Sequence, residues 1–260
     1  MHLQMEDSRD TIISFRNAEI VNGENTVIYG LDMDVRKGDF VYIIGRVGSG
    51  KTSIIRTITA ENPLYSGEGT VCGYDLRRIK EKEIPYLRRK MGVVFQDFQL
   101  LMDRSVEENL SFVLKATGWK SQSRIEERIR EVLLAVGMSS KAHKMPHQLS
   151  GGEQQRIAIA RSLLNSPEVI IADEPTGNLD PDTAEGIMQL LTGINTERGT
   201  AIVMVTHNKA IVEKYHGRVF VCADESCKEQ ILSGNDTGDM PADQENESDK
   251  QTETSPENEQ

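Results

Sequence analysis

The stretch FVYIIGRVGSGKT, residues 40–52, decides the fold of this chain. An apolar run, residues 40–44, leads into a loop that fits the phosphate-binding pattern G-x-x-x-x-G-K-[ST], and we expect a helix to begin near Lys51. This order suits a bound triphosphate, because successive backbone N–H groups and the helix N-terminus then face the anion. A glycine turn with a surface lysine is the competing interpretation, and the flanking strand and helix argue against it.

The loop supplies side chains as well as backbone. We expect Lys51 to reach the β- and γ-phosphates, and Thr52 to offer its hydroxyl to Mg²⁺. The residues predicted to contact the nucleotide in this loop are Gly45, Arg46, Val47, Gly48, Ser49, Gly50, Lys51, Thr52 and Ser53.

A second apolar run, residues 169–172, ends in the acids Asp173 and Glu174. Ligands of open parallel sheets collect at the carboxyl ends of the strands. We therefore expect Asp173 to hold Mg²⁺ and Glu174 to act as the base that orients the attacking water. Such a pair on its own would favour a solvated strand end, but its occurrence with Lys51 and Thr52 favours catalysis.

The sequence LSGGEQQR, residues 149–156, is the signature of ATP-binding cassette (ABC) proteins, and the chain resembles that family over residues 12–232. The resemblance implies an ATPase that uses ATP and Mg²⁺. It also implies that Ser150, Gly151 and Gly152 contact the γ-phosphate held by a second copy. Two copies would then close on ATP as a homodimer with two composite sites.

Further family positions map onto single residues. Gln96, in VVFQD, matches the loop glutamine that touches Mg²⁺ and the attacking water, and residues 178–180 match a loop that crosses the dimer interface. His207, after AIVMVT, matches the histidine that contacts the γ-phosphate. The resemblance thus implies a catalytic set, a metal set and further nucleotide contacts. These are respectively Glu174, His207, Gln96 and Lys51; Thr52, Gln96 and Asp173; and Gln96, Ser150, Gly151, Gly152, Asp180 and His207.

The adenine site departs from the family pattern. An aromatic residue usually stacks on the base, but the matching position here falls near Val21. Phe15 and Tyr29 are the nearby aromatic alternatives. The sequence therefore predicts phosphate binding more sharply than recognition of the base.

The resemblance and the hydrophobic pattern together predict an α/β fold: an ABC nucleotide-binding domain with a mixed, mainly parallel RecA-like core, an antiparallel β layer and a helical subdomain. The expected antiparallel strands are residues 11–21 and 27–35. In the second strand we expect alternation, with one face made of Val27, Tyr29, Leu31, Met33 and Val35 and the other of Ile28, Asp32 and Asp34. The expected helices are residues 105–117, 123–136 and 151–165, and the expected core strands include 92–95, 169–172, 201–205 and 219–222. The predicted boundaries are 11–232 for the domain, about 97–161 for the helical subdomain, and 233–260 for a tail.

Composition limits where the chain works. No apolar run approaches the ~20 residues of a membrane span, and the polar start does not resemble a signal peptide. Cys72, Cys222 and Cys227 are an odd number, which favours free thiols in a reducing compartment over zinc or disulfides. Any membrane role is therefore expected to come through a partner.

Charge is concentrated at the C-terminus. Residues 233–260 hold nine acidic residues against Lys250, so this segment carries −8 of the net charge of −11. Its polar composition predicts disorder, either as a solvating tail or as a regulatory or docking tail. The rest of the chain has no basic arm, and we therefore expect no nucleic-acid partner.

Residues 87–110, LRRKMGVVFQDFQLLMDRSVEENL, most closely resemble the FtsE family of bacterial cell-division ATP-binding proteins. That resemblance implies a peripheral protein on the cytoplasmic face of the inner membrane, at the division site. Its partner would be an FtsX-like integral membrane protein, through which dimer closure would control a periplasmic peptidoglycan hydrolase or its activator. Phe98, Leu100, Leu101 and Met102 are the candidates for gripping this partner.

Three alternatives remain open at this point. One is the ATPase subunit of a lipoprotein-release or export transporter, which differs in its membrane partner. Another is a soluble ABC protein that acts on ribosomes or DNA, for which the chain offers no basic surface. The third is a binding module without hydrolysis, against which Lys51, Asp173, Glu174 and His207 argue.

Overall fold

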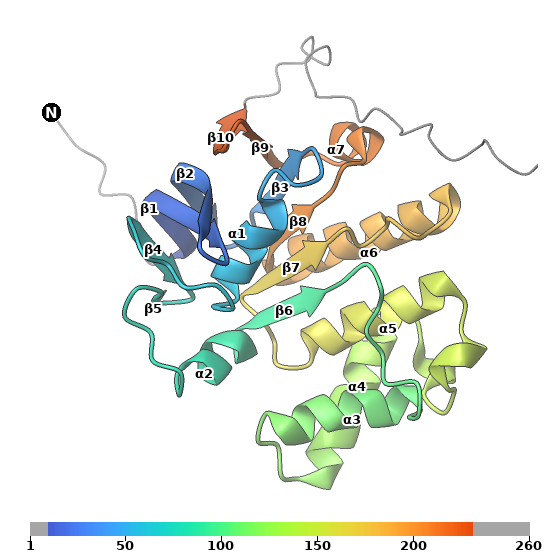
Figure 1. Cartoon of the computed structure of the whole chain (residues 1–260). Coiled ribbons are helices and arrows are strands. Elements are labelled where there is room, and N and C mark those ends of the chain that lie inside the picture. The colour runs from blue at the N-terminus through green and yellow to red at the C-terminus, as the bar shows by residue number, and fades with distance from the viewer. Residues whose placement is uncertain (1–9, 231–260) are drawn as a thin grey trace, which may run out of the picture.

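The computed structural model describes residues 10–230, which build two β-sheets flanked by helices (Figure 1). The larger sheet has the strand order β10-β9-β3-β8-β7-β6, in which β10 pairs antiparallel with β9 and the other neighbouring pairs are parallel. Its strands are β3 (Phe40–Gly45), β6 (Met91–Val94), β7 (Val169–Asp173), β8 (Ala201–Val205), β9 (Arg218–Ala223) and β10 (Ser226–Gln230).

These core strands are apolar on both faces because both faces are covered. In β3, Tyr42 and Ile44 join one hydrophobic core, whereas Val41 and Ile43 join the other. Continuous apolar runs are the expected pattern for parallel strands buried on both sides. The predicted mixed α/β architecture is thereby confirmed.

The smaller sheet is antiparallel, as predicted, with the order β2-β1-β4-β5. Its strands are β1 (Thr11–Asn22), β2 (Asn25–Arg36), β4 (Glu68–Val71) and β5 (Tyr74–Asp75). One expectation for β2 was wrong: simple alternation placed Tyr29 on the face of Leu31, with Ile28 opposite. Ile28 is fully buried and Tyr29 is 52% exposed, because the left-handed Gly30 (φ 60°) interrupts the alternation of the strand.

Three predicted helices are present within two residues of their expected ends: α3 (Val106–Ala116), α4 (Gln122–Ala135) and α5 (Gly151–Leu163). In Figure 1 they gather on one side of the large sheet, beside β6. Ser105 and Ser150 begin α3 and α5 through capping boxes. The remaining helices are α1 (Lys51–Ile58), α2 (Ile84–Arg89), α6 (Pro181–Arg198) and α7 (Lys209–Lys214), with short 3₁₀ turns at Ser139–Lys141 and Pro146–Gln148.

The structure also bears on the candidate partner-binding residues, the cysteines and the predicted boundaries. Leu100 is buried in the core with the helices, so the expectation that it grips a partner was wrong, whereas Leu101 and Met102 are exposed. All three cysteines are buried and free. The predicted tail lies outside the described residues, and the predicted domain boundaries stay a prediction. Within residues 10–230, no helix has the length and apolarity to cross a bilayer.

Candidate active site

Four segments that follow neighbouring strands carry the predicted catalytic residues to one edge of the large sheet. Lys51 follows β3, His207 follows β8, Glu174 follows β7 and Gln96 follows β6. Because β3, β8, β7 and β6 are consecutive neighbours in the sheet, their carboxyl ends form one row. The topology therefore brings together residues that lie up to 156 positions apart in the sequence.

The phosphate loop closes around its own lysine. Lys51 Nζ donates to the carbonyl oxygens of Gly45 (2.6 Å) and Arg46 (2.8 Å), and only 9% of the residue is exposed. Gly45 (φ 152°) is packed so closely against β9 that a Cβ would lie 2.3 Å from the Cys222 carbonyl oxygen. A glycine is required there because any side chain would collide with backbone.

The two acids at the end of β7 lie in different surroundings. Burial and the neighbouring Glu174 raise the pKa of Asp173, while Lys51 and Arg56 oppose that rise. Glu174 has a left-handed backbone (φ 48°), which is uncommon outside glycine. Its Oε1 lies 2.8 Å from His207 Nδ1, so the predicted base and the predicted histidine form a pair.

Gln96 is held by the loop that follows the acids. Its Nε2 donates to Asn178 Oδ1 (2.9 Å), and Asn178 Nδ2 donates back to the Gln96 carbonyl oxygen (3.3 Å). Gly177 packs against the Gln96 side chain, where a Cβ would be 2.8 Å from Gln96 Nε2. Two of the predicted functional loops are thus tied to each other.

The predicted signature residues sit at the N-terminus of α5. The Ser150 hydroxyl accepts from Glu153 N, Glu153 accepts from Ser150 N, and Lys141 pairs with Glu153 at 2.9 Å. Gly152 faces α6 so closely that a Cβ would lie 2.3 Å from Thr183 Cγ2. Asp180 caps α6 by accepting from Thr183 N, and hydrogen bonds from the side chain and then the backbone of Thr183 lower its pKa. Ser150 is exposed.

Sequence reasoning missed two residues that hold these loops. Gln155 is fully buried and donates to the Pro175 carbonyl oxygen (2.6 Å), next to Glu174. Arg161 donates to the carbonyl oxygen of Phe98 (2.9 Å) and to that of Gln99, where both residues are left-handed (φ 59° and 48°). Neither contact has a sequence signal, because each partner is a backbone carbonyl of a distant segment.

The oxygen donors suit Mg²⁺ better than a transition metal. Asp173 lies at the strand end and Thr52 is exposed at the start of α1. Among residues 10–230 no cluster of three or more His, Cys, Asp or Glu side chains is arranged to hold a metal. This is compatible with Mg²⁺, which is commonly bound through one or two protein oxygens together with substrate phosphates and water.

Burial narrows the choice of aromatic residue that could stack on adenine. Phe15 has no exposed surface and cannot stack on a base. Tyr29 is exposed, and its backbone N–H donates to the Glu225 carbonyl oxygen. Where this sheet meets Gly50 of the phosphate loop, the neighbouring side chains are the aliphatic Ile28 and Val27.

Comparison with known proteins places this geometry among nucleotide-binding cassettes. Residues 28–177 match the family model described as ABC transporter. The chain is 50% identical to the cell division ATP-binding protein FtsE of Bacillus subtilis, over 75% of this chain and 85% of that protein. Its fold is similar to the dimeric MJ0796 bacterial ABC transporter cassette (TM-score 0.74, 34% identity), with 86% of this chain and 100% of that chain covered.

Two further solved structures are similar to this chain. MJ0796 is also known as a dimer in a post-hydrolysis state bound to ADP and Pi (TM-score 0.74, 33% identity, covering 86% of this chain and 100% of that one). The cbiO1 protein of Clostridium perfringens, part of the ABC transporter complex cbiONQ, matches with a TM-score of 0.78 and 30% identity over 84% of this chain and 87% of that one.

Proposed function

Because the chain belongs to the ABC transporter family and is an ABC ATPase, we propose that it is the ATP-hydrolysing subunit of an FtsEX-type membrane complex. In this role, ATP-driven closure of a dimer controls peptidoglycan hydrolysis during cell division. The observation that carries the proposal is the 50% identity to B. subtilis FtsE over 85% of that protein. The complex, its peptidoglycan hydrolase and its position at the division site are parts of the proposal.

The residues of the sheet edge divide the work of hydrolysis. Lys51 exchanges its two carbonyl contacts for the β- and γ-phosphates of ATP, which are stronger acceptors because they are charged. Glu174 orients and polarises the attacking water. His207, whose Nδ1 lies 2.8 Å from Glu174 Oε1, positions that carboxylate and also contacts the γ-phosphate.

Mg²⁺ completes the site in this proposal, held by Asp173, Thr52 and Gln96. Burial and the charge of Glu174 both disfavour the ionised form of Asp173, and a divalent cation would offset that cost. When bound, the ion neutralises charge on the β- and γ-oxygens. Gln96 would offer its amide oxygen to the ion, because its hydrogen bond to Asn178 uses the amide nitrogen.

A second copy of the chain supplies the other half of each site. Ser150 and Gly151 lie at the N-terminus of α5, where backbone N–H groups and the helix dipole favour an anion. The exposed Ser150 is available to a nucleotide held by another subunit. The chain therefore closes head-to-tail on two ATP molecules.

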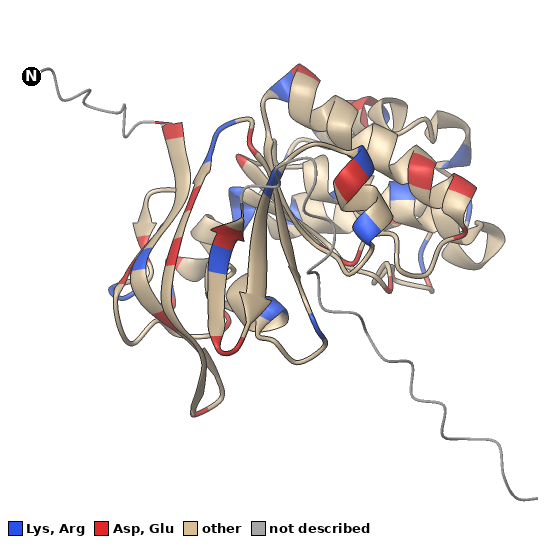
Figure 2. Cartoon of the chain, turned by 90° about the horizontal axis from the view of Figure 1, so that it is seen from above, with Lys and Arg blue, Asp and Glu red and all other residues tan. Residues whose placement is uncertain are grey.

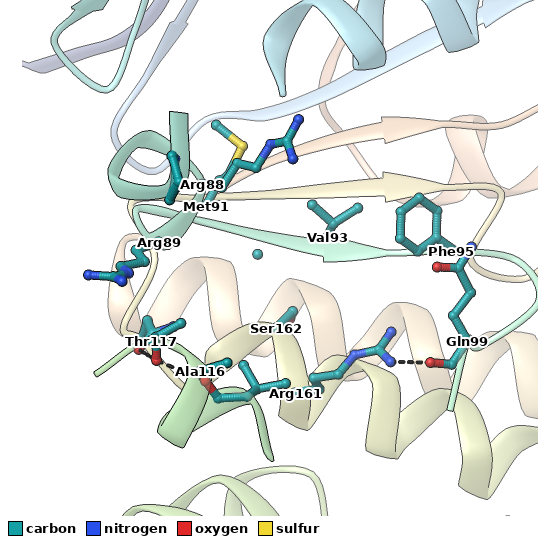
Figure 3. A pocket seen from close by; sticks show the side chains of 14 residues that line it. Arg88, Arg89, Met91, Val93, Phe95, Gln99, Ala116, Thr117, Arg161 and Ser162 are labelled. Atoms are coloured by element: carbon teal, nitrogen blue, oxygen red, sulfur yellow. Dashed lines mark hydrogen bonds between the residues drawn. The ribbon is translucent and has the colours of Figure 1, made fainter. Parts of the chain in front are cut away.

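The membrane partner docks in the groove between α2, β6, α3 and α5. This groove has a volume of about 430 Å³ and lies directly beside the loop that carries Gln96 (Figure 3). A helical segment of an FtsX-like protein bound there contacts the Gln96 loop, and this loop connects it to the catalytic residues at the edge of the large sheet. The chain thereby acts as a peripheral protein on the cytoplasmic face of the membrane.

Affinity purification tests the proposal. The Glu174→Gln variant, which should keep ATP and hold the dimer closed, is captured from detergent-solubilised native membranes with ATP and Mg²⁺, and bound proteins are identified by mass spectrometry. The matched control is Lys51→Ala, which should bind ATP poorly. Recovery of an FtsX-like protein, stronger with Glu174→Gln than with Lys51→Ala, supports the assignment. Recovery of a lipoprotein-release or export permease instead replaces the biology, and ribosomal proteins alone overturn the membrane role.

A further inference from the structure

The hairpin at one edge of the large sheet brings two of the three cysteines together. Strands β9 and β10 are joined by a two-residue turn at residues 224–225, and Cys222 pairs directly with Cys227 across the hairpin. Both side chains are free thiols, and their Sγ atoms lie 2.6 Å apart. The fold thus holds one thiol against another at a single register position.

This placement satisfies the geometry of a disulfide. Residues directly opposite in an antiparallel pair have Cα atoms about 4.5–5.5 Å apart, which lies within the range of about 4.4–6.8 Å that disulfides span. The two sulfur atoms would have to approach by only about 0.5 Å to reach the bonded distance of about 2.05 Å. Cys222 and Cys227 can therefore be bridged without rebuilding the hairpin.

The strand that carries Cys227 is weakly anchored. β10 is an edge strand of the large sheet (Figure 1), and Cys227 is the only buried residue among those of this strand. Both residues of the turn, Asp224 and Glu225, have left-handed backbones (φ 47° and 57°), a conformation that costs free energy in residues other than glycine. Few buried contacts and a strained turn favour local opening, which exposes the thiols to small oxidants.

The surroundings of the pair affect its reactivity and the kind of oxidant that can reach it. The hydrogen bond with Cys222 and burial raise the pKa of the Cys227 thiol, so this thiol ionises poorly while the hairpin is closed. Opening of the hairpin removes both effects. The exposed turn is acidic (Figure 2), so it repels anionic oxidants such as ionised small-molecule disulfides. This charge favours hydrogen peroxide, which is small and neutral.

The same hairpin supports the phosphate loop. Cys222 lies opposite Gly45 in the parallel pair of β9 and β3, and the Cys222 carbonyl oxygen leaves no room for a Cβ on Gly45. The Gly45 carbonyl oxygen in turn accepts from Lys51 Nζ. Because closely packed interiors transmit small displacements, a shift of the Cys222 backbone would move Gly45 and, through it, the lysine assigned to the phosphates.

We propose that Cys222 and Cys227 are a redox site, which hydrogen peroxide oxidises to a reversible disulfide that weakens ATP binding at the adjacent phosphate loop. The thiolate of one cysteine attacks a peroxide oxygen and becomes a sulfenic acid, and the departing hydroxide takes up the thiol proton to form water. The second thiol attacks the sulfenic sulfur, which forms the S–S bond and releases a second water. Two thiols are thus oxidised while one peroxide is reduced to two waters, and an added dithiol restores the thiols. The inference does not depend on the membrane partner.

Peptide mapping tests the modification. The full-length chain without nucleotide is treated with a small excess of hydrogen peroxide, free thiols are alkylated, and the protein is digested with trypsin. Cleavage after Arg218 and Lys228 puts both cysteines on one peptide, residues 219–228. The expected result is loss of two hydrogen atoms from this peptide without alkylation, and recovery of two alkylated thiols when dithiothreitol is added before alkylation.

Cys72 is the matched control in the same digest. It is buried between β4 and β5, and burial raises the pKa of its thiol to about 12. Cys72 should stay reduced, and Cys72→Ser should leave formation of the disulfide unchanged. A sulfenic or sulfinic acid as the end product, a disulfide that includes Cys72, or an unmodified pair at peroxide levels that oxidise free cysteine would each overturn the proposal.

ATP affinity tests the connection to the phosphate loop. Titration calorimetry compares the reduced chain, the oxidised chain and the oxidised chain after dithiothreitol. We expect oxidation to weaken ATP binding about three- to tenfold, and dithiothreitol to restore it. Unchanged affinity in a chain that carries the disulfide contradicts the connection.

Cys227→Ser separates this effect from peroxide damage at other residues, such as methionines. After the same peroxide treatment it should bind ATP as the reduced parent chain does, because it cannot form the disulfide. A thermal melt checks that the variant folds, and Cys227→Ala replaces it if the buried hydroxyl prevents folding. A loss of affinity in this variant equal to that in the parent chain shows that the disulfide is not the cause.

Discussion

The sheet edge and the groove satisfy their polar side chains in opposite ways. At the edge, the side chains pair with one another: Glu174 with His207, and Gln96 with Asn178. In the groove between α2, β6, α3 and α5, Arg88 and Arg161 donate to backbone carbonyl oxygens, and the Arg89 guanidinium lies over the ring of Tyr86. Paired side chains can exchange partners when a nucleotide binds. The groove arginines instead hold backbone carbonyls or lie over a ring, and no carboxylate is among the residues that line the groove.

One segment belongs to both regions. Residues 96–99 begin with Gln96, which contacts Asn178, and end with the two left-handed residues whose carbonyls bind Arg161. Four residues thus connect the groove to the catalytic row. Any effect of the partner on hydrolysis has a short physical path through this segment.

The largest effect is expected from replacing Glu174, the proposed base at the sheet edge. Glu174→Gln should lower ATP turnover by about 10²–10⁴-fold, because an amide does not accept the proton of the attacking water. ATP binding should remain, since Lys51 is untouched. Steady-state phosphate release and binding of a fluorescent ATP analogue measure the two properties. Normal turnover in this variant would remove Glu174 from its role.

Loss of the phosphate-loop lysine should be the next largest change. Lys51→Ala removes a charged hydrogen bond to phosphate, and we expect ATP affinity to fall about 10–100-fold. Titration with ATP by calorimetry gives the affinity, and a thermal melt without nucleotide checks that the chain still folds. An unchanged affinity would contradict the assignment of residues 45–52.

A milder change tests whether the two regions are connected. Arg161→Lys keeps the charge but cannot hold two carbonyls in the fork geometry of a guanidinium. We expect kcat to fall about three- to tenfold with KM for ATP nearly unchanged, because the Gln96 loop is less well positioned. Arg130→Lys on α4 serves as the control. A change in KM with normal kcat would place Arg161 outside this connection.

The smallest expected effect concerns stability alone. The pKa of Asp173 is higher in the folded chain than its ordinary value of 3.8, so its ionised form costs stability at neutral pH. This cost diminishes as pH falls through the folded pKa and is gone below the unfolded one. Asp173→Asn should therefore raise the Tm of the nucleotide-free chain by about 2–4 °C at pH 7. A lower Tm would show that the carboxylate is stabilised in a way that its surroundings do not indicate.

Local patterns predicted the parts of the fold that depend on neighbouring residues. The phosphate loop and the buried strands have fixed spacings, and Ser105 and Ser150 mark helix starts through short-range hydrogen bonds. The helix α6 was not predicted, although Asp180 followed by Pro181 is a start signal of the same kind. The side on which Tyr29 lies was predicted wrongly because one left-handed glycine shifts the strand.

The candidate site was predictable where a family position exists and not where a contact spans the fold. Gln96, Glu174 and His207 were identified through order and spacing, and the structure brings them to one edge. Their assigned roles stay predictions. Gln155 and Arg161 were missed because what they bind are carbonyl oxygens, which every residue has. Such contacts become visible only when the chain is folded.

The left-handed backbone of Glu174 has a consequence for the descendants of this sequence. Asn, Asp and Gly adopt that conformation more readily than Glu, so the position carries strain for which the proposed role of Glu174 in hydrolysis accounts. A duplicated gene released from ATP turnover would gain stability by accepting one of those residues there. Inactive paralogues should therefore arise easily and fold well, and their residue at this position should report the loss before any assay does.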